Sequence, residues 1–176
     1  MRPEEQDYPH MLELFARIPL GVEVWPGQEV VPVVLESSVI SLSAILLDQE
    51  FYDLVLSTRY ESYGIQMVGA NGLIPMKALA YLDLDRRRTI GQHVDHDDIK
   101  KHRNDVFRLA LTLPNQQGPI LSPKVLEALR SFVRAHPDDS PEWASIRQAL
   151  RGTVRTPPSP KQLLTVLSTY FGLTET

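Results

Sequence analysis

The sequence predicts an α+β protein in which a mixed sheet comes first and helices follow. Up to about Val68 the chain carries short alternating or valine-rich stretches that prolines interrupt, which is typical of strands. From Asn71 onward apolar residues recur at helical spacing, and three Ser-Pro pairs mark helix starts. We therefore expect a sheet region over residues 1–69 and a helical portion over residues 70–176.

The sheet region contains three strand candidates before its first helix. "MLELFAR" alternates between two faces and lies between Pro9 and Pro19. "GVEVWPGQEVVPVVLE" indicates short strands joined by a turn, whereas "SSVISLSAILL" suits a strand or a helix equally well. "DQEFYDLVLST" predicts a helix with Asp48 as its N-cap, and "YGIQMV" predicts another short strand.

The helical portion is predicted from apolar spacing and from capping residues. "NGLIPMKALAYLDLDRRR" suits a helix in which Pro75 is tolerated because it falls in the first turn. The next helix should begin near Asp95 and end about Leu113. The Ser-Pro pairs predict helices over about Pro123–Ala135, Pro141–Arg151 and Pro160–Phe171, with a flexible connector at 151–159.

Composition excludes several classes of protein. With 43% apolar residues among 176, the chain can bury a core, while a net charge of −4 and a pI near 5.7 argue against a general nucleic-acid binder. No cysteine is present, so disulfides and thiolate metal sites are excluded. No apolar run is long enough for a membrane span, and the first residues do not resemble a signal peptide. We expect a cytoplasmic protein without membrane contact.

The segment "HVDHDDIKKHRNDVFRL" raises the question of a metal site, because its His96-Asp97 doublet occurs in metal-dependent phosphohydrolases. A helix start explains the same residues: Asp95 is a good N-cap, Asp98 suits a capping box, and the acids lie at the positive end of the helix dipole. The structural interpretation is favoured. A metal-dependent phosphohydrolase that uses His93, His96 and Asp97 is the weakest of the three functional hypotheses that the sequence allows.

The segment "GANGLIPMKALAYLDLD" imitates a nucleotide-binding signature, a glycine turn followed by a D-x-D pair. Two carboxylates with one residue between them point the same way on a strand, which allows them to chelate metal. On a helix they diverge by about 200°. Because the helical pattern runs through Asp83 and Asp85 into Arg86, we interpret the pair as an ordinary polar helix end. The neighbouring arginines and acids predict a solvated, salt-bridged helix surface.

Three stretches together resemble a known family: "DYPHMLELFAR", "LESSVISLSAILLDQEFYDLV" and "LIPMKALAYLDLDRRRTIGQHVDHDDIKKHRNDVFRL". They are similar to the later part of bacterial nucleotidyltransferase-like proteins, relatives of the AbiE-type toxins of type IV toxin–antitoxin systems. The resemblance covers roughly residues 6 to 113. It implies that "MLELFAR" is the third acidic strand, with Glu13 as the third metal-binding carboxylate, and that Lys77 lies near the nucleotide phosphates. A rim glutamate and a lysine along a helix flank are the structural alternatives.

The chain departs from that family at its catalytic half. The glycine turn and the first two carboxylates should lie upstream of Met1, and one glutamate cannot hold a magnesium pair alone. The resemblance thus implies that the sheet region over residues 1–69 is a remnant of a nucleotidyltransferase-like sheet. We therefore expect no cofactor as the chain stands, whereas the full family site would bind magnesium and a nucleoside triphosphate. The leading hypothesis is a truncated or degenerate nucleotidyltransferase-family protein. The alternative is a non-catalytic protein-binding or oligomerisation module, such as a toxin–antitoxin component, with a homodimer through an exposed sheet edge or another protein partner.

Overall fold

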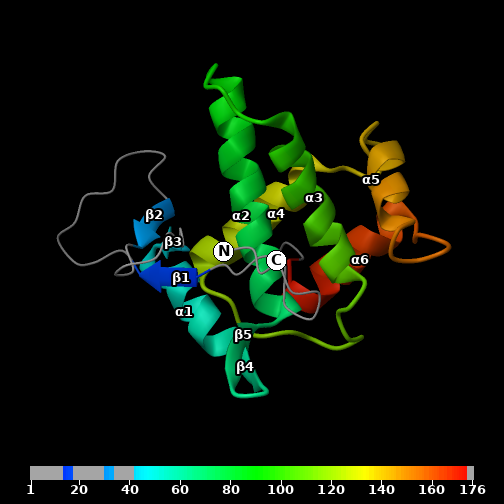
Figure 1. Cartoon of the computed structure of the whole chain (residues 1–176). Helices are drawn as coiled ribbons and strands as arrows, with labels where there is room; N and C mark the ends of the chain where they lie inside the picture. The colour runs from blue at the N-terminus through cyan, green and yellow to red at the C-terminus, as the bar shows by residue number, and fades with distance from the viewer. Residues whose placement is uncertain (1–13, 18–29, 34–41, 174–176) are drawn as a thin grey trace. The chain divides into compact units, whose positions relative to one another are not determined.

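The chain divides into two compact units, residues 1–56 and 57–176. The structure, a computed structural model, describes residues 14–17, 30–33 and 42–173 (Figure 1). Within that part of the chain, strands precede a set of helices, so the predicted α+β class is confirmed. The boundary between the expected sheet region, residues 1–69, and the expected helical portion, residues 70–176, stays a prediction.

The described residues of the first unit include a three-stranded mixed sheet. Its strand order is β1-β3-β2, with β1 (Leu14–Arg17) parallel to β3 (Leu42–Leu47) and β2 (Val30–Val33) antiparallel to it. The ambiguous segment before Asp48 is therefore a strand where it is described. The predicted strand at "MLELFAR" is confirmed for β1, and the turn predicted at Pro26-Gly27 lies outside the described residues.

Helix α1 (Gln49–Thr58) follows β3 directly and begins as the sequence predicts. The Asp48 carboxylate accepts a hydrogen bond from the backbone N–H of Phe51 at 3.1 Å, which satisfies one of the free donors of the first turn. Phe51 is fully buried. The N-cap prediction is thus confirmed.

The second unit opens with a β-hairpin of strands β4 (Arg59–Ser62) and β5 (Ile65–Val68). The two residues between the strands, Tyr63 and Gly64, have φ angles of 52° and 76°. Positive φ at both positions is the signature of a type I′ turn, whose twist matches that of paired strands. The sequence predicts β5 but not β4, because Tyr-Gly is not one of the usual Asn-Gly or Asp-Gly signals of this turn.

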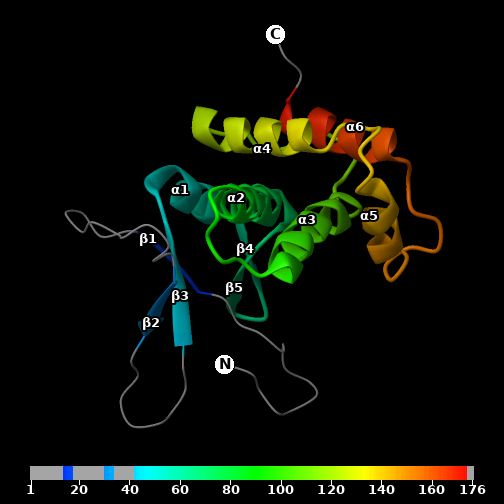
Figure 2. The same cartoon turned by 90° about the horizontal axis from the view of Figure 1, so that it is seen from above.

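Five helices follow the hairpin in the second unit. Helix α2 packs against α3 and α4, and α3 also packs against α5 and α6. Figure 1 shows α2 and α3 side by side, and Figure 2, which looks nearly along α2, shows α4 running across it. Their bounds are α2 Ala70–Thr89, α3 His96–Ala110, α4 Pro123–Ala135, α5 Trp143–Leu150 and α6 Pro160–Phe171.

Two details of these helices correct the sequence predictions. Pro75 lies beyond the first turn, because α2 already begins at Ala70, so the helix continues through a residue that cannot donate a backbone hydrogen bond. Helix α5 begins at Trp143 rather than at Pro141. The Ser140 carbonyl accepts the Trp143 N–H at 3.2 Å, which leaves the two residues after Ser140 in a turn.

The other helix starts follow their capping residues. Asp95 caps α3, although its carboxylate accepts from the Asp97 N–H at 2.8 Å rather than from Asp98. Ser122 caps α4, and Ser159 forms a complete capping box with Gln162 at the start of α6. The helices predicted over 123–135 and 160–171 have these bounds in the structure, whereas α3 ends at Ala110, before the predicted Leu113.

Replacing Ser159 by alanine is expected to lower the free energy of unfolding by about 1 kcal/mol. The Gln162 N–H donates to the Ser159 hydroxyl, and the Gln162 side chain accepts from the Ser159 N–H at 2.8 Å, so the change removes one bond and weakens the other. Chemical denaturation followed by circular dichroism measures the loss. Thr165→Ala, at an exposed site within the same helix, serves as the control and should not destabilise the protein.

The core of the second unit is built from apolar side chains of all five helices. These side chains recur at helical spacing, and aromatic rings occupy its centre. The buried apolar residues are Ile74, Ala78, Tyr81, Ile99, Val106, Phe107, Ala110, Leu121, Val125, Leu129, Phe132, Trp143, Ile146, Leu150, Leu163, Leu167, Tyr170, Phe171 and Leu173.

Candidate functional site

The two site residues that the family resemblance implies occupy different units. Glu13 lies outside the described residues, immediately before β1 in the sequence. Lys77 is half-buried on α2, close enough to His102 of α3 for its positive charge to help lower the pKa of that imidazole, an effect for which burial is the larger cause. Both roles stay predictions, because no nucleotide or metal contact bears on them.

The histidine-aspartate segment forms the start of α3. His96 is the first residue of the helix and is exposed, and the Asp97 carboxylate accepts from the Lys100 ammonium at 3.1 Å. In the described part of the chain, no three histidine, aspartate or glutamate side chains come together as a metal-binding group. The capping that the structural interpretation predicts is present at Asp95.

The D-x-D pair lies within α2, as its helical spacing predicts. Asp83 pairs with Arg86 at 3.0 Å and with Arg87 at 3.4 Å, and Asp85 pairs with Arg88. These ion pairs link residues three or four positions apart, the spacing at which side chains meet on a helix surface. The segment is therefore a salt-bridged helix surface, and the nucleotide-binding signature is only imitated.

A buried polar cluster joins α3, α5 and the end of α4, and the sequence did not predict it. Arg103 of α3, only 5% exposed in its side chain, contacts the Glu142 carboxylate at 3.1 Å and donates to the Ser145 hydroxyl at 2.9 Å. Its Nε and Nη2 also donate to the Asn104 side chain. His136, the C-cap of α4, is fully buried, and its Nε2 lies 3.4 Å from the other oxygen of Glu142.

Aromatic rings surround the His136 end of this cluster. The His136 ring lies 4.5 Å from the Phe132 ring, 4.9 Å from Tyr81 and 5.7 Å from Phe107, measured between centroids. Its Nδ1 lies 2.8 Å from the Phe132 carbonyl oxygen, so this nitrogen carries the proton that the bond requires. Nε2 then carries no proton and makes no hydrogen bond to Glu142, so the polar contacts that join helices are those of Arg103, between α3 and α5.

Burial is the main influence on the protonation of His136. It lowers the pKa below the ordinary 6.5, and Arg103 acts in the same direction, whereas the bond to the Phe132 carbonyl and the charges of Glu142 and Asp85 oppose it. Because the lowering effect is larger, the ring is neutral at neutral pH. Burial is also the largest influence on Tyr81, and it raises the pKa of the Tyr81 hydroxyl to about 12.

Stability should fall as the pH drops below about 6.5. The pKa of His136 is lower in the folded protein than in the unfolded chain, so protons bind preferentially to the unfolded chain as the pH falls between the two values. The stability that the neutral ring contributes is complete above the unfolded pKa. Thermal unfolding at about pH 7.5 and about pH 5.5 measures the difference. His136→Gln should reduce the difference in stability between the two pH values, whereas His96→Gln, at an exposed position, should leave that difference unchanged. An equal reduction in both variants would contradict the attribution of the difference to His136.

An exposed apolar surface lies on the β4–β5 hairpin. We name it the hairpin face: Tyr60, Ile65 and Met67 on one side of the two strands, with Tyr63 at the turn. Tyr60 pairs across the strands with Met67, and Ile65 pairs with Ser62, so these side chains share one side. Their exposed fractions are 51% for Tyr60, 63% for Ile65, 37% for Met67 and 101% for Tyr63.

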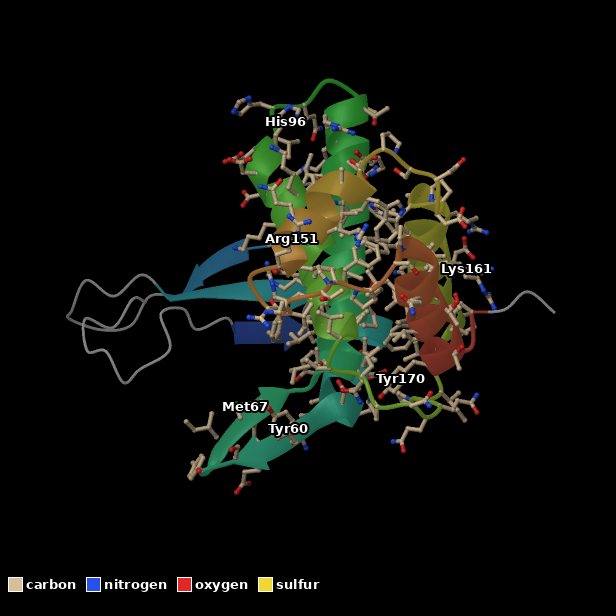
Figure 3. The ribbon with its side chains drawn as sticks, turned by 90° about the vertical axis from the view of Figure 1, so that its right-hand side faces the viewer. Tyr60, Met67, His96, Arg151, Lys161 and Tyr170 are labelled. Carbon is tan, nitrogen blue, oxygen red and sulfur yellow. The ribbon has the colours of Figure 1, made fainter. Side chains whose placement is uncertain are left out.

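The opposite side of the hairpin faces the start of α2. A side chain added at Gly72 would lie 2.7 Å from the Val68 side chain and 2.1 Å from that of Thr58, so the helix approaches closely there. Figure 3 shows Tyr60 and Met67 close together on the hairpin, far from His96 at the other end of the helices. The hairpin face is thus turned away from α2. The sequence signal of the hairpin face is the alternation of apolar Ile65 and Met67 with polar Gln66 after Gly64, together with Tyr60 before it.

Comparisons with protein-family models, with curated proteins and with solved structures find no match to this chain. In the part of the chain that the structure describes, no helix combines the length and the apolar character that a bilayer crossing requires.

Proposed function

We propose that the chain is a non-catalytic protein-binding module and that the hairpin face is its contact surface. The exposure of Tyr60, Ile65, Met67 and Tyr63 on one small element carries this proposal. Tyrosine and methionine are enriched in protein interfaces, and apolar side chains gathered on one surface mark interaction sites. Single exposed apolar residues would need no explanation, but these four occur within eight consecutive positions.

The form of the hairpin supports the same proposal. A two-stranded hairpin is only marginally stable by itself in water, and among the described residues each of its strands pairs on one side only. A protein partner that adds a strand or covers the hairpin face would satisfy both needs. In the buried polar cluster, in contrast, the Arg103 guanidinium group is directed at Glu142 and Ser145 and serves to hold α3 and α5 together.

Site-specific photo-crosslinking of the whole protein tests this function. A photoreactive amino acid in place of Tyr63, which is fully exposed at the turn, should form a covalent protein adduct in living cells. Tyr60→Ser should abolish that adduct because it removes the aromatic side chain that β4 contributes to the hairpin face. The same amino acid in place of Arg151, an exposed residue after α5, is the matched control. Equal adduct formation at both positions, or none at residue 63, would refute the proposal.

A nucleotidyltransferase-family protein without the full catalytic apparatus is the second candidate. One observation favours it: a mixed sheet in which β1, directly after Glu13, runs parallel to β3. In this proposal Glu13 is the third carboxylate, Lys77 lies near the phosphates, and an AbiE-type toxin–antitoxin setting supplies the protein partner. Isothermal titration with Mg-ATP and Mg-GTP tests it. Saturable heat would support it, and no heat at millimolar nucleotide would remove it.

A further inference from the structure

We propose that the partner of the hairpin is a second copy of this chain. The edge of β4 that faces away from β5 pairs antiparallel with the same edge of β4 in the other copy. A twofold axis at Tyr60 relates the two copies. The inference rests on the proposed protein-binding function and names the partner and the register. It joins two hairpins into a four-stranded sheet in the order β5-β4-β4-β5. Both copies use the same residues, as a twofold interface requires.

The hydrogen-bond pattern of the hairpin determines which residues of β4 are available. Ser62 and Ile65 flank the two-residue turn, and such a pair exchanges both of its backbone hydrogen bonds. Pairs alternate along the ladder, so Ser62 and Tyr60 direct their backbone groups toward β5. Arg59 and Glu61 therefore direct their N–H and C=O groups outward, at the free edge. An added strand must pair with these two residues.

Only certain registers align two such edges. With Tyr60 on the twofold axis, Arg59 of each copy lies opposite Glu61 of the other, and both residues have outward backbone groups. A shift that places Glu61 on the axis sets two carboxylates opposite each other, and one that places Arg59 there sets two guanidinium groups opposite each other. Like charges directly opposite destabilise a strand pair, and opposite charges stabilise it. The Tyr60 register is thus selected by charge.

The side chains are positioned for this pairing. Arg59 and Glu61 are both exposed, and Glu61 uses one carboxylate oxygen to accept from the Gln66 side chain at 3.0 Å, which leaves the other for an arginine. The two Tyr60 rings meet at the axis as a cross-strand aromatic pair on the hairpin face. Since each β4 contributes only four residues, the contact is small and the dimer should dissociate readily on dilution.

Charge reversal tests the register in the full-length protein. Sedimentation velocity from micromolar to millimolar concentration should show reversible dimerisation of the wild type. Arg59→Glu places a new carboxylate opposite Glu61 of the other copy, and Glu61→Arg opposes two arginines, so each variant alone should dimerise at least about tenfold more weakly. An equimolar mixture of the two should recover dimers, because both cross-strand pairs are then of opposite charge. The double variant Arg59→Glu/Glu61→Arg should also recover them.

Three results would overturn the inference: a wild type that stays monomeric at millimolar concentration, single variants that dimerise like the wild type, or a mixture that fails to recover dimers. Circular dichroism and thermal unfolding establish that each variant is folded, and Arg151→Glu is the charge-matched control. The photo-crosslinking experiment separates the two proposals. Adducts at residue 63 with other proteins only would refute the dimer and retain the protein-binding function, whereas no adduct would refute both.

Discussion

Phe132→Ala is expected to lower the free energy of unfolding by about 3–5 kcal/mol. Phe132 is fully buried at the centre of the aromatic core, with its ring 5.3 Å from that of Tyr81 and 5.5 Å from that of Phe107. Truncation removes apolar contacts and leaves a cavity that neighbouring helices cannot fill completely. Chemical denaturation followed by far-ultraviolet circular dichroism measures the loss.

Val133→Ala provides the control for that substitution. Val133 is the next residue of α4 and is only half-buried, so its truncation should cost about 1 kcal/mol or less. Similar losses in the two variants would mean that Phe132 does not occupy the centre of the packed core.

Arg103→Met is the second substitution with a large expected effect. The methionine keeps most of the side-chain volume but removes the guanidinium group that joins Glu142 and Ser145 of the α5 region to α3. We expect a loss of about 2–3 kcal/mol, less than for a fully enclosed ion pair, because the Glu142 side chain is 42% exposed and can regain contact with water. The pKa of His136 should also rise, since the positive charge of Arg103 helps to lower it.

Arg108→Met supplies a matched control on the same helix. Arg108 pairs with Asp105 three residues away, and its side chain is 43% exposed, so the loss should stay below about 1 kcal/mol. Denaturation measures the stabilities, and nuclear magnetic resonance titration of the His136 ring measures the pKa. Equal stabilities of the two variants, with no change at His136, would contradict the role assigned to the buried cluster.

Local sequence signals predicted the helices of the second unit well. Ser122-Pro123 and Ser159-Pro160 define the first residues of α4 and α6, because the cap and the proline act within a single turn. Asp95 marks the start of α3 for the same reason. The Ser140-Pro141 pair predicts a helix start at Pro141, but α5 begins at Trp143. Trp143 is buried, and its indole N–H donates to the Pro137 carbonyl at 2.8 Å, a contact that the Ser-Pro pair does not indicate.

The polar contacts were harder to predict because they depend on how helices meet. The sequence places both Lys100 and Lys101 at a helical spacing from Asp97, and the structure pairs Asp97 with Lys100. The contact of Arg103 with Glu142 joins residues on different helices, so no spacing rule indicates it. The hairpin face escaped prediction because β4 is short and half of it is charged.

The most direct test of the hairpin as a protein-contact element is the rate of amide hydrogen exchange at Arg59 and Glu61 in the intact protein. Their backbone N–H groups point away from β5, so a strand added at that edge of β4 slows their exchange. Tyr63, at the exposed turn, is the internal reference in the same molecule. We expect Arg59 and Glu61 to exchange several-fold more slowly relative to Tyr63 at millimolar than at micromolar protein concentration. An unchanged ratio between the two concentrations would contradict the hairpin as a contact between copies of the chain.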